Sequence, residues 1–331
     1  MPPSSEPRTS FARLAGLFGR SNEVALLACL VAVIVFFGFA SEYFFSLRNM
    51  SNVLGQASIM LIAGIGVAMV FMSGEVDISV GSLMAAVAIP LIEVMNATGS
   101  LALGIGAALL LGLVIGTVNG LLAAYAGINS LIVTLGTLFI VRGGVYLYTG
   151  KQAIPDKVYL ESFFQIGNET LLGILPYSAL IAFALVAVFA YVMGWRRFGR
   201  QVYAVGSSAA VARLAGFDTR RVKFICFVLS SLLATLAGVL LASRVGSAVH
   251  VAGLNFEFQV VAAVVLGGVS LAGGIGTIAG MALGVLILAF VANGLGMLDF
   301  PTEWQLVITG AVIVAAVAID EAKRRRAALT A

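Results

Sequence analysis

The chain has 331 residues, of which 61% are hydrophobic and only 10% are charged. A soluble domain carries about 25% charged residues, so this composition excludes a water-soluble protein and indicates one that crosses a membrane several times. The single histidine and the two separated cysteines, Cys29 and Cys226, argue against a metal site and a disulfide framework. The net charge of +4 reflects membrane topology rather than nucleic-acid binding. We therefore expect no cofactor, no metal ion and no nucleic-acid partner.

Apolar segments recur along the chain, and a helix needs about 20 apolar residues to cross a bilayer. We expect an all-α membrane protein of about ten transmembrane helices, at 24–40, 53–73, 81–97, 100–126, 130–149, 173–194, 222–243, 258–271, 274–297 and 304–320. The segments 81–97 and 258–271 are short, and either could enter the membrane and return on the same side. We expect the first helix to stay uncleaved, with a cleaved signal peptide as the alternative.

Basic residues gather in three places: a head (1–22), the polar interval 195–223 and a tail (322–331). Such clusters mark the cytoplasmic side of a membrane protein. Ten crossings then put both termini in the cytoplasm, around one transmembrane domain (23–321), and make 150–172 an outer loop. If one of the short segments does not cross the membrane, the tail faces outward. Its four basic residues disfavour that orientation, because basic residues gather on the cytoplasmic side.

The interval 195–223 holds seven of the nineteen Lys and Arg residues of the chain. Its middle is rich in alanine and predicts a short helix over Ala209–Ala215, which Gly216 is placed to end. A short helix on a basic loop can dock a cytoplasmic partner. The alternative is a solvated linker whose arginines only fix the topology.

An internal repeat is visible at an offset of 174 residues, where Gly106–Leu122 aligns with Gly280–Gly296 without gaps. The match includes the pairs Asn119/Asn293 and Gly120/Gly294. Because the two segments run in opposite directions in this topology, the pattern is typical of the inverted repeats of transporters. Small residues also recur at every fourth position, which predicts tight helix packing at Gly112, Gly116, Gly120, Gly276, Gly280 and Gly284.

Carboxylates at membrane depth are costly and are candidates for function, which draws attention to Glu75 and Asp77 between the second and third segments. If they lie in a solvated loop instead, Asp77 only caps a turn. Uncharged polar residues could line a path for a polyhydroxyl solute, or only join helices by hydrogen bonds: Asn119, Asn129, Thr134, Thr137, Asn255, Gln259 and Asn293. Arg142 could reach the interface or pair with an acidic side chain.

Sequence motifs of several other functions are either absent from the chain or lack the structural context that they require. No P-loop occurs, so the chain does not bind ATP through that motif, and no series of buried acids and bases suits a proton relay. The glycine-rich run at Gly274–Ala279 opens an apolar segment without a preceding strand, and the lone His250 gives Ser270 no credible catalytic partner. Uphill transport would therefore need a second protein chain that supplies the energy. The interval 195–223 is the expected attachment site of that chain.

The sequence resembles the permease subunits of bacterial ABC sugar importers, in the branch for ribose, arabinose, xylose and galactosides. The resemblance covers about 25–320 and is carried by SGEVDISVGS (73–82) and by the stretches 118–150, 198–248 and 264–280. It implies a homodimer of ten-helix subunits in the bacterial inner membrane. It also implies two cytoplasmic ATPase domains and a periplasmic or extracellular sugar-binding protein as partners.

The interval 195–223 is similar to the coupling loop of this family, which inserts a helix into a cleft of the ATPase. Importers carry Glu-Ala-Ala, three residues and Gly, and the matching positions here are Ala210, Val211, Ala212 and Gly216. The family's glutamate is absent here, so the contact that it would make with the ATPase is in doubt. Arg213 then becomes the natural polar contact of the coupling helix. The resemblance implies that this helix consists of Ala209, Ala210, Val211, Ala212, Arg213, Leu214, Ala215 and Gly216. In the acidic stretch, Glu75 and Ile78 depart from the family pattern, whereas Asp77, Ser79 and Gly81 keep their places.

We therefore expect a membrane-spanning importer subunit that moves a pentose, hexose or related polyol inward, powered by a separate ATPase. It is not itself an enzyme. A stand-alone secondary transporter is the alternative, although such a protein favours buried ionisable pairs. An intramembrane enzyme would need a nucleophile and a base, which the sequence does not offer.

Overall fold

The computed structural model describes residues 22–301, 303–304, 306–308, 310–312 and 314. The expected basic head and tail fall outside these residues. The helices are α2 (Asn22–Ala40), α3 (Leu47–Met72), α4 (Val80–Thr98), α5 (Leu101–Gly120), α6 (Ser130–Thr149), α7 (Glu161–Asn168), α8 (Tyr177–Trp195), α9 (Arg197–Ser207), α10 (Ala209–Leu214), α11 (Thr219–Val245), α12 (Phe256–Leu266) and α13 (Ile278–Met297), with a π-helical turn η1 (Leu121–Tyr125) after α5.

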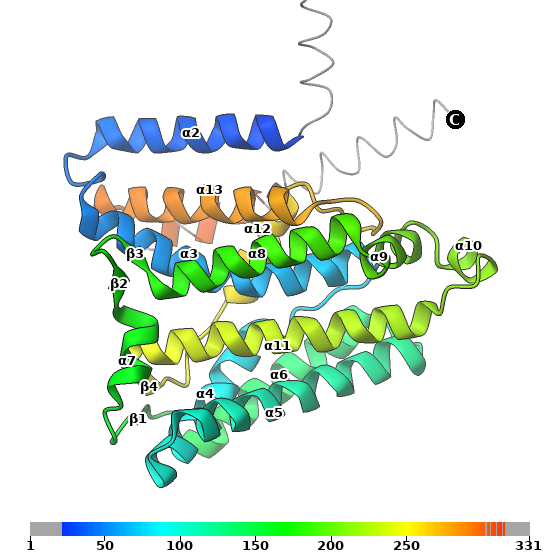
Figure 1. Ribbon diagram of the computed structural model, residues 1–331, viewed down its shortest axis with the longest axis horizontal. Helices are drawn as coiled ribbons and strands as arrows, with labels where there is room; N and C mark the ends of the chain where they lie inside the picture. The colour runs from blue at the N-terminus through cyan, green and yellow to red at the C-terminus, as the bar shows by residue number, and fades with distance from the viewer. Residues whose placement is uncertain (1–21, 302, 305, 309, 313, 315–331) are drawn as a thin grey trace, which may run out of the picture.

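Helices α2, α3, α4, α5 with η1, α6, α8, α11 and α13 are each long and apolar enough to cross a membrane. The expectation of an all-α membrane protein is thereby confirmed. Two short antiparallel ribbons join loops: β1 (Ile154–Pro155) pairs with β4 (Ser247–Ala248), and β2 (Thr170–Leu171) pairs with β3 (Leu175–Pro176). Figure 1 shows these ribbons and α7 at one end of the bundle, the α7 end, and α10 at the opposite end, the α10 end.

The helices begin where short polar side chains can cap them. Ser46, Ser100, Asn129, Asp218 and Thr277 each accept a hydrogen bond from a backbone N–H of the first turn that follows. Such caps satisfy N–H groups that have no partner inside the helix. The boundaries of α3, α5, α6, α11 and α13 are therefore determined locally by the sequence.

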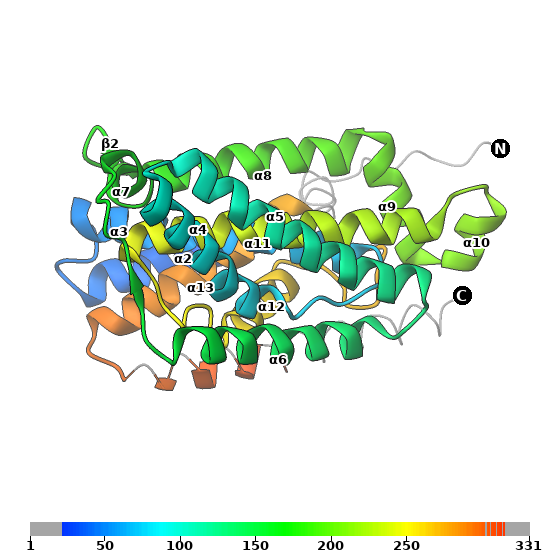
Figure 2. The same cartoon turned by 90° about the horizontal axis from the view of Figure 1, so that it is seen from below.

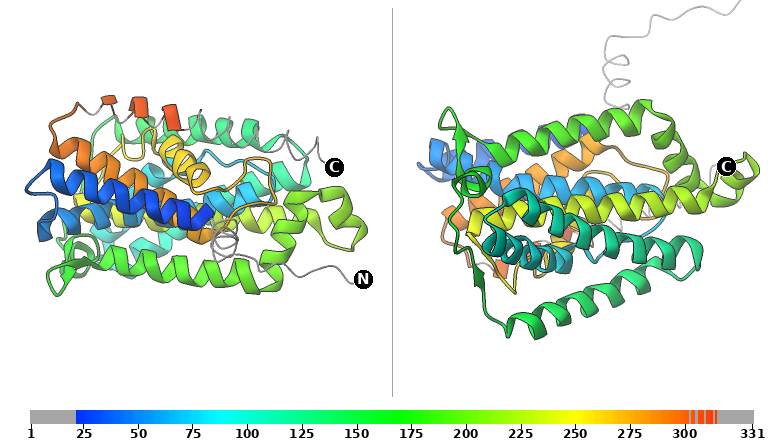
Figure 3. Two further views of the ribbon diagram at one scale, coloured as in Figure 1. Left: turned by 90° about the horizontal axis from the view of Figure 1, so that it is seen from above. Right: turned by 60° about the horizontal axis from the view of Figure 1, so that its bottom comes forward.

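Helix α3 is the centre of the bundle. From Ala57 to Ser73 every residue except Met60 is buried. It packs against α8, α9, α11, α12 and α13. Helix α2, in contrast, lies along α13 at the edge of the bundle and exposes Phe36 and Phe39 (Figures 1 and 3). A helix that is apolar all round and exposed is stable only where lipid or another helix covers it.

The segment expected at 258–271 does not form a full transmembrane helix. Helix α12 has 11 residues, which gives a length of about 16 Å, roughly half the thickness of the hydrocarbon core. The chain nevertheless crosses the bundle here, as the irregular stretch 246–255 followed by α12. Gly246, which ends α11, lies at the α7 end. Gly274 lies at the α10 end, where its N–H donates to Met72 O (3.0 Å). Irregular backbone at membrane depth is tolerated when protein buries it.

The other short segment, at 81–97, is the 19-residue helix α4. An irregular stretch also precedes α4, at 73–79, directly after α3. Adding 174 to the bounds of α3, α4 and α5 gives those of α11, α12 and α13 within three residues, except that α12 ends six residues earlier than its counterpart. Helices α3 and α11 run antiparallel, since Gly55 lies against Arg244 and Gly66 against Ser230. The internal repeat is therefore visible in the structure as two inverted sets of elements.

The glycines at every fourth position serve close helix contacts. On α5, Gly112, Gly116 and Gly120 lie against Thr235, Ser231 and Phe224 of α11. In the second set, Gly280 and Gly284 of α13 lie against the backbone of Gly267 and Ala263. Gly276 differs from the expectation of a shared helix face, because it precedes α13 and packs against Val269 in the loop.

Candidate functional site

The interval 195–223 forms two helices at the α10 end. Helix α9 carries the chain across this end, and α10 projects beyond the rest of the bundle (Figures 1 and 2). Ser208 caps α10 by accepting from the Val211 N–H (3.3 Å), and Gly216 follows it with a φ of +82°. The short helix and its glycine stop therefore lie where the sequence predicts them.

Helix α10 turns only one side toward the protein. Ala212 is buried, whereas Val211 and Leu214 are 64% and 90% exposed. Arg213 is also exposed. An apolar surface of this kind, carried on a projecting polar loop, is typical of an interaction site.

The loop is tied to the membrane-spanning helices through α9. The Tyr203 hydroxyl donates to Gly276 O (2.9 Å), and burial raises the pKa of this phenol. Gly206 is so close to Met72 O, at the end of α3, that a side chain there would collide with it. Helix α9 is thereby in direct contact with the end of α3 and with the loop before α13.

A polar cleft of about 650 Å³ opens beside α10. It lies between the loop 126–130 and the start of α11, and Arg213, Arg220 and Lys223 line it. Glu75 lies in the same cleft and forms an ion pair with Lys223. Glu75 is therefore placed at the mouth of the bundle, joining the 73–79 stretch to α11.

Asp77 lies deeper and is fully buried. Its Oδ1 accepts from the Ser79 N–H (3.0 Å) and hydroxyl (2.7 Å), and its Oδ2 accepts from the Ser230 hydroxyl of α11 (2.8 Å). The Asn119 amide donates to the Ser79 hydroxyl (3.1 Å), and Thr137 donates to Asn119 Oδ1 (2.6 Å). These bonds join α5, α6 and α11 to the irregular stretch 73–79, directly before α4.

Charged side chains also surround the second irregular stretch. Arg142 of α6 donates to His250 O (3.1 Å) and Ala252 O (2.7 Å). Glu257, in the first turn of α12, is buried, and its Oε2 has no hydrogen-bond partner among the described residues. The second irregular stretch approaches the first turn of α4 at Gly253 and Gly81, where neither position has room for a Cβ atom.

The chain matches the family model described as branched-chain amino acid transport system / permease component over residues 49–317. It is 34% identical to the ribose import permease RbsC of Escherichia coli strain K12, over 94% of this chain and 96% of that protein. It is 36% identical to the L-arabinose ABC transporter permease AraH of Azospirillum brasilense, over 98% and 95%.

The chain belongs to this family of ABC importer permeases. A third relative, the autoinducer 2 import permease LsrC of Shigella flexneri, is 34% identical over 91% of this chain and 87% of its own. No solved structure matches the chain. The family and its branch agree with the resemblance stated above, and they place the permease in the inner membrane.

The structure brings some of the predicted pathway residues of the permease together and separates others. Asp77, Asn119 and Thr137 form one network. Thr134 joins it from α6 by a bond to Val76 O (3.4 Å), whereas Asn129 caps α6. Asn293 is remote and exchanges hydrogen bonds with Asn49 of α3 (2.9 and 3.0 Å).

The hydrogen-bond partners of Asp77, Ser79 and Ser230, are not among the site residues expected from the sequence, although Ser79 is named there as matching the family pattern. Ser79 lies two residues beyond Asp77, the spacing of a local turn, which is a readable signal. Ser230 is one of several small polar residues in an apolar helix and gives no such signal. Arg142 does not pair with Asp77 in the described part of the chain, because it donates to the other irregular stretch.

Replacing Asp77 with alanine should lower the unfolding free energy of the permease by about 3 kcal/mol, because three buried hydrogen-bond donors lose their acceptor. Asp77→Asn keeps an acceptor for Ser79, and we expect it to cost about 1 kcal/mol. Thermal or denaturant unfolding in detergent measures both. Equal, small effects of the two substitutions would contradict a structural role for the carboxylate.

Proposed function

We propose that this permease carries a monosaccharide or related polyol inward across the inner membrane as part of an ABC importer. Its likeness to ribose and arabinose permeases along nearly the whole chain supports this proposal most strongly. The substrate is a polyhydroxyl solute, which is compatible with uncharged hydrogen-bonding side chains along the bundle. The energy comes from a separate ATPase subunit, since the chain has no P-loop.

In this proposal the α10 end faces the cytoplasm, because its loop is the most basic part of the described chain. The exposed side of α10 then docks on the ATPase, with Arg213 as its polar contact. The α7 end faces outward and receives the sugar from a binding protein. The functional unit is a homodimer of ten-crossing subunits with both termini in the cytoplasm.

The polar network around Asp77 and the ion pair of Glu75 hold the irregular stretch 73–79 between α6 and α11. We assign Asp77, Asn119 and Thr137 to the fixed part of the path rather than to sugar contact, because their polar atoms belong to one hydrogen-bonded network. Glu75, at the mouth of the cleft, is placed to meet the leaving substrate. Motion of α10 would reach this stretch through α9 and Lys223.

Sugar uptake by the reconstituted transporter tests the function. The permease is assembled in proteoliposomes with the ATPase and binding protein encoded beside it, and uptake of D-ribose and L-arabinose is measured with and without ATP. We expect ATP-dependent accumulation of at least one sugar, together with co-purification of the ATPase. Accumulation under an ion gradient without any ATPase would instead establish a secondary transporter.

A further inference from the structure

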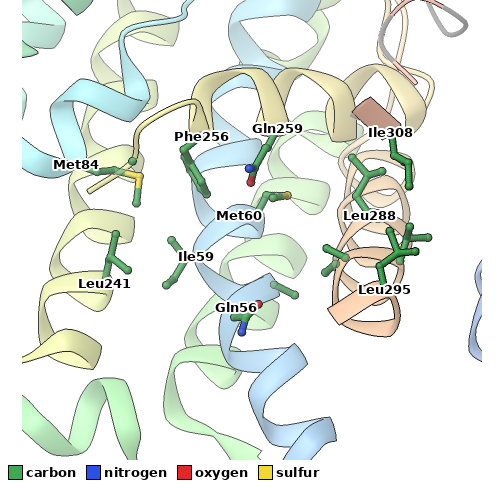
Figure 4. A pocket seen from close by; sticks show the side chains of 15 residues that line it. Gln56, Ile59, Met60, Met84, Leu241, Phe256, Gln259, Leu288, Leu295 and Ile308 are labelled. Carbon is green, nitrogen blue, oxygen red and sulfur yellow. The ribbon is translucent and has the colours of Figure 1, made fainter. Parts of the chain in front are cut away.

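A cavity of about 240 Å³ lies between α3, α12 and α13. Residues in the middle of α3, in the second half of α13 and near the end of α11 line it, so it lies in the half of the bundle toward the α7 end. Most of the wall is apolar, with Met60, Met84 and Leu288 among its residues. Figure 4 shows Phe256 and Gln259 reaching from α12 toward α3, and Gln56 on α3 below them.

The two carboxamides are unusual at this place. Gln56 is exposed, Gln259 is half-buried, and neither side-chain amide makes a hydrogen bond within the described part of the chain. An amide without a partner is costly in an apolar environment. Each carboxamide offers two donors and an acceptor, so together they can meet a solute that both donates and accepts.

The irregular stretch before α12 borders this space. Gly253 in that stretch, together with Phe256 and Gln259 in the first turn of α12, lines the cavity, as does Gln56 of α3. The cavity is much larger than one water molecule needs. It is also lined by only a few convergent polar groups in an apolar wall, which is typical of a small-molecule site.

A second cavity of about 220 Å³ adjoins the first toward the α7 end. Met84 and Leu241 line both cavities and therefore stand between them. The second cavity reaches Val245 and Ser247, at the end of α11. A flexible methionine side chain can change its rotamer at little cost, so the two spaces can be joined.

We propose that the cavity between α3, α12 and α13 is a monosaccharide subsite in the outer half of the permease. Gln56 and Gln259 bind sugar hydroxyls, and the ring of Phe256 packs against the apolar face of the sugar. The sugar arrives from the α7 end past Met84 and Leu241. This inference rests on the proposed function, because it takes the substrate to be a sugar that enters from the α7 end.

Uptake kinetics of the complete reconstituted transporter test the subsite, with D-ribose and L-arabinose as probes. We expect Gln56→Met and Gln259→Met each to lower kcat/KM for uptake about 5- to 10-fold, the effect of one lost hydrogen bond. The double variant should lose at least about 30-fold. Phe256→Leu should also lower uptake, and Phe256→Tyr should retain it.

The matched control is Phe258→Leu on the same helix, because Phe258 is 48% exposed and does not line the cavity. We expect it to stay within about twofold of the wild type. If the wild type transports sugar and the glutamine variants equal this control, the subsite is disproved while the proposed function stands. If the wild type transports no sugar, both proposals fail together.

Protection of position 259 from thiol labelling by bound sugar distinguishes sugar contact from a merely structural role of Gln259. In a Cys29→Ser background, which removes the exposed native thiol, Gln259→Cys is labelled with a small methanethiosulfonate reagent. An excess of the transported sugar should slow labelling at 259 at least about threefold and leave Phe258→Cys unchanged. Equal labelling rates at 259 with and without sugar would overturn the proposal.

Discussion

Exchanging Arg213 for glutamate should abolish sugar uptake while the permease still inserts into the membrane. Arg213 lies on the exposed side of α10, between the exposed apolar side chains of Val211 and Leu214. Reversing a charge at the centre of an interface costs several kcal/mol. We expect uptake to fall at least about 100-fold, equivalent to about 3 kcal/mol, and the ATPase to be lost from the purified complex.

Two further variants separate the charge from the position of the helix. Gly216 has a φ of +82°, and its N–H donates to Arg213 O (3.0 Å). Proline cannot adopt this φ and has no N–H to donate. We therefore expect Gly216→Pro to cause the same loss of uptake. Arg197→Glu is the control, since Arg197 is exposed on the same loop but lies at the start of α9. Wild-type uptake by the Arg213 and Gly216 variants would remove α10 from the coupling path.

The elements that could be predicted from the sequence are those whose cause is local. Long apolar runs predict the spanning helices, and the alanine-rich run with Gly216 predicts α10 to within a residue. The internal repeat could also be predicted, because Asn119 and Asn293 recur at one offset. Each of these signals depends on neighbouring residues and needs no knowledge of tertiary contacts.

The irregular stretch 246–255 before α12 could not be predicted in this way, because contacts with α4 and α6, which are distant in the chain, hold it. The end of α12 does have a local signal, since Gly267 and Gly268 directly follow Leu266 and Gly268 has a φ of +85°. The expected bounds 258–271 extend past this signal. Nothing in the sequence singles out Gln56 either, since its importance comes only from facing α12 across the bundle.

The roles of the two acidic residues Glu75 and Asp77 also could not be predicted from the sequence. The sequence presents Glu75 and Asp77 as neighbours with one candidate role, whereas the fold gives them different partners. Glu75 pairs with Lys223 at the mouth of the bundle, and Asp77 bonds to Ser79 and Ser230 inside it. Two residues so close in the chain differ in burial, and only the tertiary structure shows which of them the bundle encloses.

Replacing Gly253 with alanine should destabilise the permease strongly, because the added methyl group has no room. Gly253 has a φ of +65°, and a Cβ atom there would lie 2.3 Å from Gly81 O. The backbone conformation costs about 1 kcal/mol, and forcing the stretch 246–255 away from the first turn of α4 costs about 2 kcal/mol more. We expect a loss of about 3 kcal/mol in unfolding free energy and, with it, a marked fall in the amount of folded protein in the membrane.

Gly246→Ala is the matched control for this contact. Gly246 has nearly the same φ, +69°, but nothing lies within 4 Å of a Cβ atom added there. It should therefore cost only the backbone contribution of about 1 kcal/mol, measured by the same unfolding experiment in detergent. The difference between the two variants isolates the approach of Gly253 to Gly81, one of the places where the two inverted halves meet. Equal costs would mean that this close contact between the stretch 246–255 and the first turn of α4 does not stabilise the bundle.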